Sequence, residues 1–145
     1  MKRLLIEIGV GVGLLILVQL AEAAVTLPFP PATDAVGQAR WDALLLEFAL
    51  TAPCALLIAW VLAYLRLPAG AMDALLRGLV WLGVFVVAMA AIAVANANQM
   101  IFTVPTLYLL MAAIPAGAAL GGASRARRHA GTPTALGRRR PVRAR

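Results

Sequence analysis

Residues 75–95 read LLRGLVWLGVFVVAMAAIAVA, and Arg77 is the only charged side chain in this stretch. A hydrocarbon core about 30 Å thick is crossed by roughly 20 residues of α-helix. The stretch therefore has the length and composition of a transmembrane helix. Three other segments meet the same criterion, so the sequence predicts spanning helices at about 4–24, 43–65, 75–95 and 101–120.

The composition of the whole chain agrees with this interpretation. Of the 145 residues, 63% are hydrophobic and 13% are charged, and the mean hydropathy is +0.90. Soluble domains contain about 45–50% apolar residues, so a water-soluble fold of this length could not cover so much apolar surface. The apolar runs are continuous rather than alternating, which favours helices over a membrane β-barrel. The predicted fold class is therefore all-α.

The connections and the end of the chain predict the domain organisation. The later connections are short, which makes neighbouring helices antiparallel, so we expect an integral membrane four-helix up-down bundle over residues 1–123. Residues 124–145 contain eight arginines and no acidic residue, together with prolines and glycines. This composition predicts a disordered, basic, cytoplasmic tail.

Lysine and arginine are distributed unevenly between the two sides of the predicted bundle. With the N-terminus inside, Lys2, Arg3, Arg66, Arg77 and the tail arginines lie on the cytoplasmic side, and Arg40 alone lies outside. Cytoplasmic segments of membrane proteins carry an excess of these residues. The pattern predicts a multi-pass protein of the plasma (inner) membrane with both termini in the cytoplasm.

The first apolar segment has a second interpretation. A basic start, an apolar run and the sequence Ala-Glu-Ala at 21–23 are also typical of a secretory signal with a cleavage site. Glu7 inside the run, and the length of the run, favour a retained helix. The sequence leaves open whether residues 1–23 are retained or cleaved, and the topology of the remaining helices is the same in both cases.

Acidic side chains in or near the spans are the first candidates for function, because a charge at the bilayer centre costs about 2.5–3.5 kcal/mol. Glu47 lies four or five residues into the second predicted helix, and Thr51 follows one turn later on the same face. Four more polar residues are expected at this level: Gln19, Glu22, Asn96 and Asn98. We expect these six residues to form a shallow, outward-facing pocket that contacts an ion or substrate, with Glu47 taking up a proton or binding a cation. The alternative is that helix ends are polar because they touch water, and that amides and hydroxyls hold helices together.

Two other features have structural interpretations. Glu7 is expected to reach the interface or to pair with Lys2 or Arg3. Gly9 and Gly13 form a GxxxG motif, which favours close helix packing within the chain or between copies.

The basic tail is expected to contact lipid. Anionic headgroups attract arginines near the membrane surface by about 1 kcal/mol each. The expected headgroup contacts are Arg125, Arg127, Arg128, Arg138, Arg139 and Arg140. The expected partners are the lipid bilayer, anionic headgroups, and a membrane protein or a second copy. Nucleic acid is not expected, because no aromatic residues are interleaved with the arginines for base stacking.

Enzymatic chemistry finds little support in the sequence. The single histidine, His129, lies in the tail and the single cysteine is Cys54, so we expect no catalytic residues, no metal site and no cofactor. The leading hypothesis is a structural or accessory subunit of a membrane assembly. The first alternative is a small proton- or cation-coupled carrier or channel that uses Glu47 and the outer polar cluster. The second is a lysis or immunity protein that acts on the membrane.

One structural criterion separates the first two hypotheses. If Glu47 faces the bundle interior beside Glu22 and Asn96, the carrier is favoured. If Glu47 faces headgroups or water, the accessory subunit is favoured.

Overall fold

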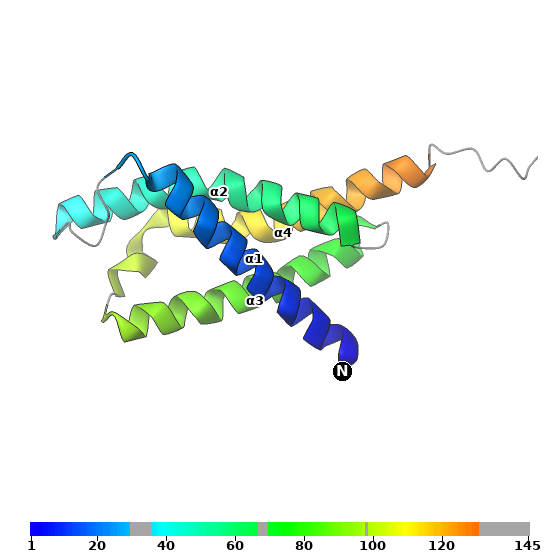
Figure 1. The fold of residues 1–145 in the computed structure, drawn as a ribbon, viewed down its shortest axis with the longest axis horizontal. Coiled ribbons are helices and arrows are strands. Elements are labelled where there is room, and N and C mark those ends of the chain that lie inside the picture. Colours follow the sequence, from blue (N-terminus) through cyan, green and yellow to red (C-terminus); the bar gives the residue numbers. More distant parts are fainter. Residues whose placement is uncertain (30–35, 67–69, 98, 131–145) are drawn as a thin grey trace, which may run out of the picture.

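The computed structural model describes residues 1–29, 36–66, 70–97 and 99–130. The predicted all-α four-helix bundle is confirmed (Figure 1). The helices are α1 (Lys2–Thr26), α2 (Gln38–Arg66), α3 (Ala71–Ala95) and α4 (Pro105–Ala130), and a short 3-10 helix, η2 (Gln99–Thr103), precedes α4. All four α-helices are long and apolar enough to cross a membrane.

The last helix differs most from the sequence prediction. It begins at Pro105 rather than at residue 101, because proline is pre-organised for the first turn of a helix and the residues before it form η2. It also continues to Ala130, so residues 124–130, which the sequence placed in the tail, are helical. Residues 131–145 lie outside the described part of the chain.

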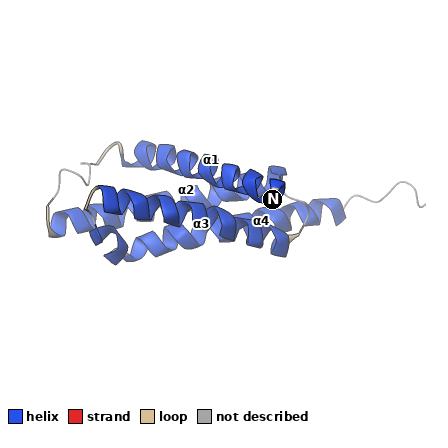
Figure 2. Cartoon of the chain, turned by 90° about the horizontal axis from the view of Figure 1, so that it is seen from below, coloured by secondary structure: helices blue, strands red, loops and turns tan. Residues whose placement is uncertain are grey.

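Helix α4 is the central element of the bundle. Half of its most apolar window is buried, compared with 28% in each of the other three helices. Helix α1 lies diagonally across the bundle, over α2 and α3 (Figures 1 and 2). The N-terminus and the end of α4 lie at one end of the bundle, and the α1–α2 connection and η2 lie at the other (Figure 1). We call these the terminal end and the loop end.

Small residues bring α4 close to its neighbours. A Cβ atom added at Gly121 would lie 2.8 Å from the Cβ of Ala63 on α2. A Cβ atom added at Gly78 of α3 would lie 2.7 Å from the Cβ of Ala118 on α4. Within lipid, helix association depends on such close van der Waals contact rather than on the exclusion of water. The small faces of α3 and α4 therefore determine how tightly the bundle packs.

The GxxxG motif of α1 is not used inside the bundle. Gly9 and Gly13 have no atom of another helix within 4 Å of the Cβ that each would carry, whereas a Cβ on Gly11 between them would lie 3.0 Å from Val84. Close packing of α1 therefore uses Gly11, and the face with Gly9 and Gly13 points away from the other helices.

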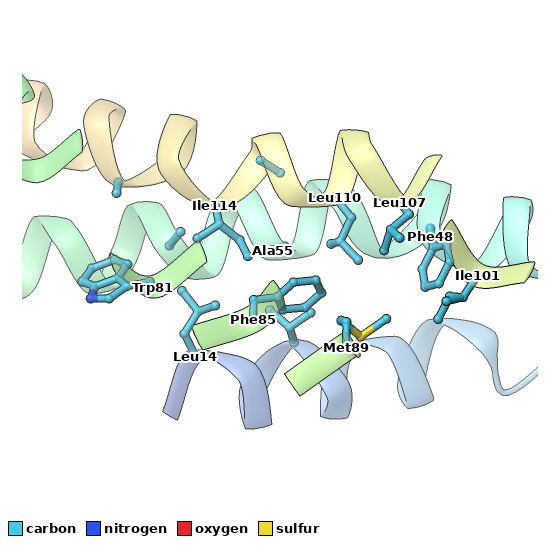
Figure 3. Packing of buried hydrophobic residues seen from close by; sticks show 14 of the residues in the cluster. Leu14, Phe48, Ala55, Trp81, Phe85, Met89, Ile101, Leu107, Leu110 and Ile114 are labelled. Atoms are coloured by element: carbon cyan, nitrogen blue, oxygen red, sulfur yellow. The ribbon is translucent and has the colours of Figure 1, made fainter. Parts of the chain in front are cut away.

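The middle of the bundle is filled by large apolar side chains from all four helices (Figure 3). Leu14, Phe85, Leu110 and Ile114 are fully buried there. The outward faces are also apolar, and many of their leucines, valines and isoleucines are exposed. In water such a surface would be strongly unfavourable, so the surroundings of the outward faces are the lipid of a bilayer.

Candidate functional site

The buried stripe of α1 places two glutamates at opposite ends of one helix face. Its buried residues are Val10, Gly11, Leu14 and Val18. Positions three or four residues apart lie on the same side of a helix. The stripe therefore extends to Glu7 at the terminal end and to Glu22 at the loop end, and both side chains are half-buried against the bundle.

Three residues of α2 share the face that meets Glu22. Arg40, Leu44 and Glu47 follow one another at intervals of four and three residues, so they project from the same side of the helix. Arg40 lies in the first turn of α2, which begins at Gln38. This face points to the interior at the loop end of the bundle.

The two faces enclose a pocket of about 420 Å³ at the loop end. Five polar side chains line it, namely Gln19, Glu22, Arg40, Glu47 and Asn96. Phe48 of α2, Met89 of α3 and Ile101 of η2 form part of its apolar wall (Figure 3). We call this site the polar pocket. It contains two acids, one guanidinium and two amides, and is bounded by apolar core.

The two glutamates of the polar pocket are neighbours. Their carboxyl groups line the same pocket and lie close enough to interact with each other, and Gln19 Nε2 donates to Glu22 Oε2 at 3.1 Å. A hydrogen bond between two carboxyl groups needs one proton, and two ionised carboxylates at this distance repel each other. The pair can therefore share a proton or bind a cation between its oxygens.

Arg40 is the member of the polar pocket that the sequence interpretation missed. Its Nε atom is buried and has no hydrogen-bond partner, and it forms no ion pair with Glu22 or Glu47, all three being described residues. Its spacing from Leu44 and Glu47 was a usable signal, because it places the guanidinium on the same face of α2. The sequence interpretation used its charge only for topology, as the one basic residue of the outer side.

The structure brings together four of the six residues expected at the site: Gln19, Glu22, Glu47 and Asn96. Thr51 is completely buried and its hydroxyl donates to the backbone carbonyl of Glu47 at 2.8 Å. It does not line the polar pocket, and its hydroxyl hydrogen is used within α2. Asn98 lies outside the described residues. The role of these residues in ligand contact stays a prediction.

A second polar cluster lies at the terminal end of the bundle. Arg77 Nη1 of α3 donates to Glu7 Oε1 at 2.9 Å, and Trp81 Nε1 donates to Glu7 Oε2 at 3.0 Å. Arg77 Nε also donates to Asp73 Oδ2 at 3.0 Å. Glu7 is thus paired, but with residues of α3 rather than with Lys2 or Arg3. The charge of Glu7 is compensated by Arg77, which lies 70 positions further along the chain. No local sequence pattern could indicate this pair.

An apolar layer separates the two polar clusters. Leu14, Phe85 and Leu110 lie in this layer (Figure 3). Thr51 is the only completely buried polar side chain among the described residues, and its hydroxyl is bonded to its own helix. The described residues therefore provide no continuous polar path along the bundle.

The arginines of α4 make contacts within the protein. Arg125 Nη1 donates to the carbonyl oxygens of Tyr64 and Leu65 at 3.1 and 3.0 Å, where the last carbonyls of α2 lack helical partners. The guanidinium of Arg128 lies 5.4 Å from the centre of the Tyr64 ring, and Arg127 is exposed. Arg125 therefore helps to cap α2. The predicted headgroup contacts Arg138, Arg139 and Arg140 lie outside the described residues.

The fold defines the class of this protein as a small multi-pass membrane protein with four candidate spanning helices. Comparison of the chain with protein-family models, with curated proteins and with solved structures finds no match. Across the described ranges, no group of three or more His, Cys, Asp or Glu residues could hold a metal ion.

Proposed function

We propose that this protein is a small carrier of the plasma (inner) membrane that takes up a proton or a cation in the polar pocket. The observation that supports this proposal is the position of Glu47, which faces the bundle interior beside Glu22 and shares the pocket with Asn96. Placing two ionisable acids side by side inside a membrane-spanning bundle has a high free-energy cost. A bound proton or cation compensates that cost.

A carrier fits this geometry better than a channel. Ion channels need a polar or water-filled path. An apolar layer that includes Leu14 and Phe85 lies between the polar pocket and the terminal end of the bundle. Transport would therefore require a rearrangement. Helix α1 is the element best suited to move, because it packs on α2 and α3 through a narrow buried stripe and carries a glutamate at each end.

The charge distribution supports an orientation in which the polar pocket opens away from the cytoplasm. Lys2, Arg3, Arg66 and Arg77 belong to the terminal end, whereas Arg40 lies at the loop end. The excess of basic residues at the terminal end is typical of the cytoplasmic side. The proposal also requires that α1 is retained, because Gln19 and Glu22 form one wall of the pocket.

Electrical recording on proteoliposomes adsorbed to a solid-supported membrane tests the proposal. Steps in pH, and steps in methylammonium concentration at constant pH, should produce transient charge movement in the wild-type protein. Glu22→Gln and Glu47→Gln should each abolish the response, because each removes a carboxylate from the pair. The matched control is Asp42→Asn. Asp42 lies on the same helix at the same end, but it is exposed and bonds to Gln38.

The shape of the response separates the alternatives. A sustained current along an ion gradient would contradict the carrier and indicate a channel. Wild-type responses in both glutamate variants, with the variants correctly folded by gel filtration, would remove the polar pocket from the mechanism.

A different observation favours an accessory subunit as the second candidate function. Gly9 and Gly13 leave an open, small-residue face on α1, and such faces allow close approach of another membrane helix. Cross-linking and co-purification after mild extraction would detect such a partner. We propose no enzymatic role, and no feature of the described residues favours the lysis or immunity class.

A further inference from the structure

We infer that the polar pocket binds a zwitterion, with the ammonium group of the ligand at Glu22 and Glu47 and its anionic group at Arg40. This inference rests on the proposed function and deepens it by naming the class of ligand. The pocket contains groups of both charges that are not paired with each other, since Arg40 forms no ion pair with either glutamate among the described residues. A purely cationic ligand would leave the guanidinium without a counterion.

Arg40 is suited to bind the anionic end of such a ligand. Its buried Nε has no acceptor within the protein, and buried donors without a partner are rare in native structures. A guanidinium presents a planar fork of donors that matches a carboxylate or a phosphate. Arg40 also lies in the first turn of α2, where the free backbone N–H groups and the helix dipole favour negative charge.

The opposite side of the pocket is suited to an ammonium group. Glu22 and Glu47 present neighbouring carboxyl groups, and Gln19 and Asn96 add amide oxygens from α1 and from the end of α3. A primary ammonium has three donors and no acceptor, so it needs several converging oxygens. The glutamate pair holding one proton carries one negative charge, which balances Arg40. A zwitterion then enters without changing the net charge of a partly buried site.

The remaining walls indicate an apolar substituent on the ligand. Leu44, Phe48, Met89 and Ile92 line the pocket beside the charged groups. Its volume of about 420 Å³ lies within the range of small-molecule sites. Two sources provide this chemistry, namely a free amino acid with an apolar side chain and the phosphoethanolamine headgroup of a membrane lipid. Both carry a primary ammonium close to an anionic group.

Calorimetry on the full chain in maltoside micelles, which carry no charge, tests the inference with three soluble probes. L-Leucine carries both charges, L-leucinamide carries only the ammonium, and 4-methylpentanoate carries only the carboxylate. Leucine should bind about 10- to 100-fold more tightly than either analogue, which corresponds to the loss of one charge-assisted contact. The lipid arm measures retention of phosphatidylethanolamine and of phosphatidylglycerol by native mass spectrometry, and the ethanolamine lipid should be preferred.

Two variants should remove the advantage of leucine in a crossed pattern. Arg40→Gln should make leucine bind no better than leucinamide, and Glu47→Gln should make it bind no better than 4-methylpentanoate. Arg40→Lys keeps the positive charge but not the planar fork of donors. Its preference for leucine over leucinamide should therefore lie between those of Arg40→Gln and the wild type. The matched controls are Arg66→Gln and Asp42→Asn, which change the same charges outside the pocket. Gel filtration of each variant separates loss of binding from loss of folding.

Each outcome has a defined meaning. The crossed pattern with leucine supports the inference with an amino acid as the source, and the same dependence on Arg40 and Glu47 seen only with phosphatidylethanolamine supports it with lipid as the source. Equal binding of leucine and leucinamide, unchanged in Arg40→Gln but lost in Glu47→Gln, would overturn the zwitterion and leave the cation site of the proposed function intact. If Glu47→Gln changes the affinity of none of the probes, both the zwitterion site and the cation site of the proposed function are overturned.

Discussion

The close contact between α2 and α4 makes Gly121→Ala the most informative change in the apolar part of the bundle. A Cβ atom at this position would meet the backbone oxygen of Trp60, and it would lie 2.8 Å from the Cβ of Ala63 and 2.9 Å from the backbone nitrogen of Tyr64. Two of these three neighbours are backbone atoms, which cannot rotate away as the end of a side chain can. The two helices must therefore move apart.

The size of the effect follows from these distances. Non-bonded carbon atoms prefer a separation of about 3.5–4.0 Å, so α4 must move away from α2 by roughly 1 Å. Overpacking of this kind costs about 1–3 kcal/mol. Gly13→Ala is the matched control, because the same methyl group is added within a helix where no atom lies within 4 Å. Any gain in helix propensity is common to both variants, so the difference between them isolates the strain.

Reversible unfolding in mixed micelles of dodecyl maltoside and SDS measures this difference. Gly121→Ala should unfold at a lower SDS fraction than the wild type, and Gly13→Ala should unfold at the same fraction or a higher one. Equal free energies of unfolding for the two alanine variants would refute the inference that α2 and α4 are in backbone contact at this position.

Two further predictions concern the terminal end of the bundle. Arg77→Met leaves Glu7 half-buried without its ion pair, and it should lower the free energy of unfolding by about 1–3 kcal/mol, less than for a fully buried pair because Arg77 keeps 27% of its side chain exposed. The double variant with Glu7→Gln should recover most of this loss, Arg66→Met should have little effect, and a single Arg77→Met variant as stable as the wild type would contradict the role of the pair. For topology, alkaline phosphatase fused after the last residue should be inactive and a green fluorescent protein there should fluoresce, whereas active phosphatase at that end would reverse the proposed orientation.

The polar pocket shows which features of a site can be predicted from residue spacing and which cannot. Gln19 and Glu22 were placed at one depth with Glu47 because depth follows from the number of residues along a spanning helix. The same reasoning grouped Thr51 with them, because position along and around a helix does not show that a hydroxyl already bonds to the preceding turn. Arg40 was overlooked because a charged residue at a helix end is expected to lie in water at the membrane surface, so it needed no further explanation.

The partners of Glu7 could not be predicted from its neighbours in the sequence. The sequence offered Lys2 and Arg3 as near neighbours, but the side chain of Glu7 points along the buried stripe of α1 toward α3. Arg77 and Trp81 reach it because α1 crosses α3 at this level. Which helix faces overlap depends on the crossing of α1 and α3, and that crossing is determined by packing between elements distant in sequence.

The sequence alone determined that this chain has four helices long and apolar enough to span a membrane, since the cost of placing polar backbone and charge in lipid depends on residue type and on segment length. It also determined which polar groups share a depth. Only the tertiary structure decided that Glu22 lies beside Glu47, that Arg40 shares their pocket and that Gly11 rather than Gly9 or Gly13 packs inside. These outcomes depend on how each helix is rotated and crossed against its neighbours, and short-range packing of small and large side chains sets that geometry.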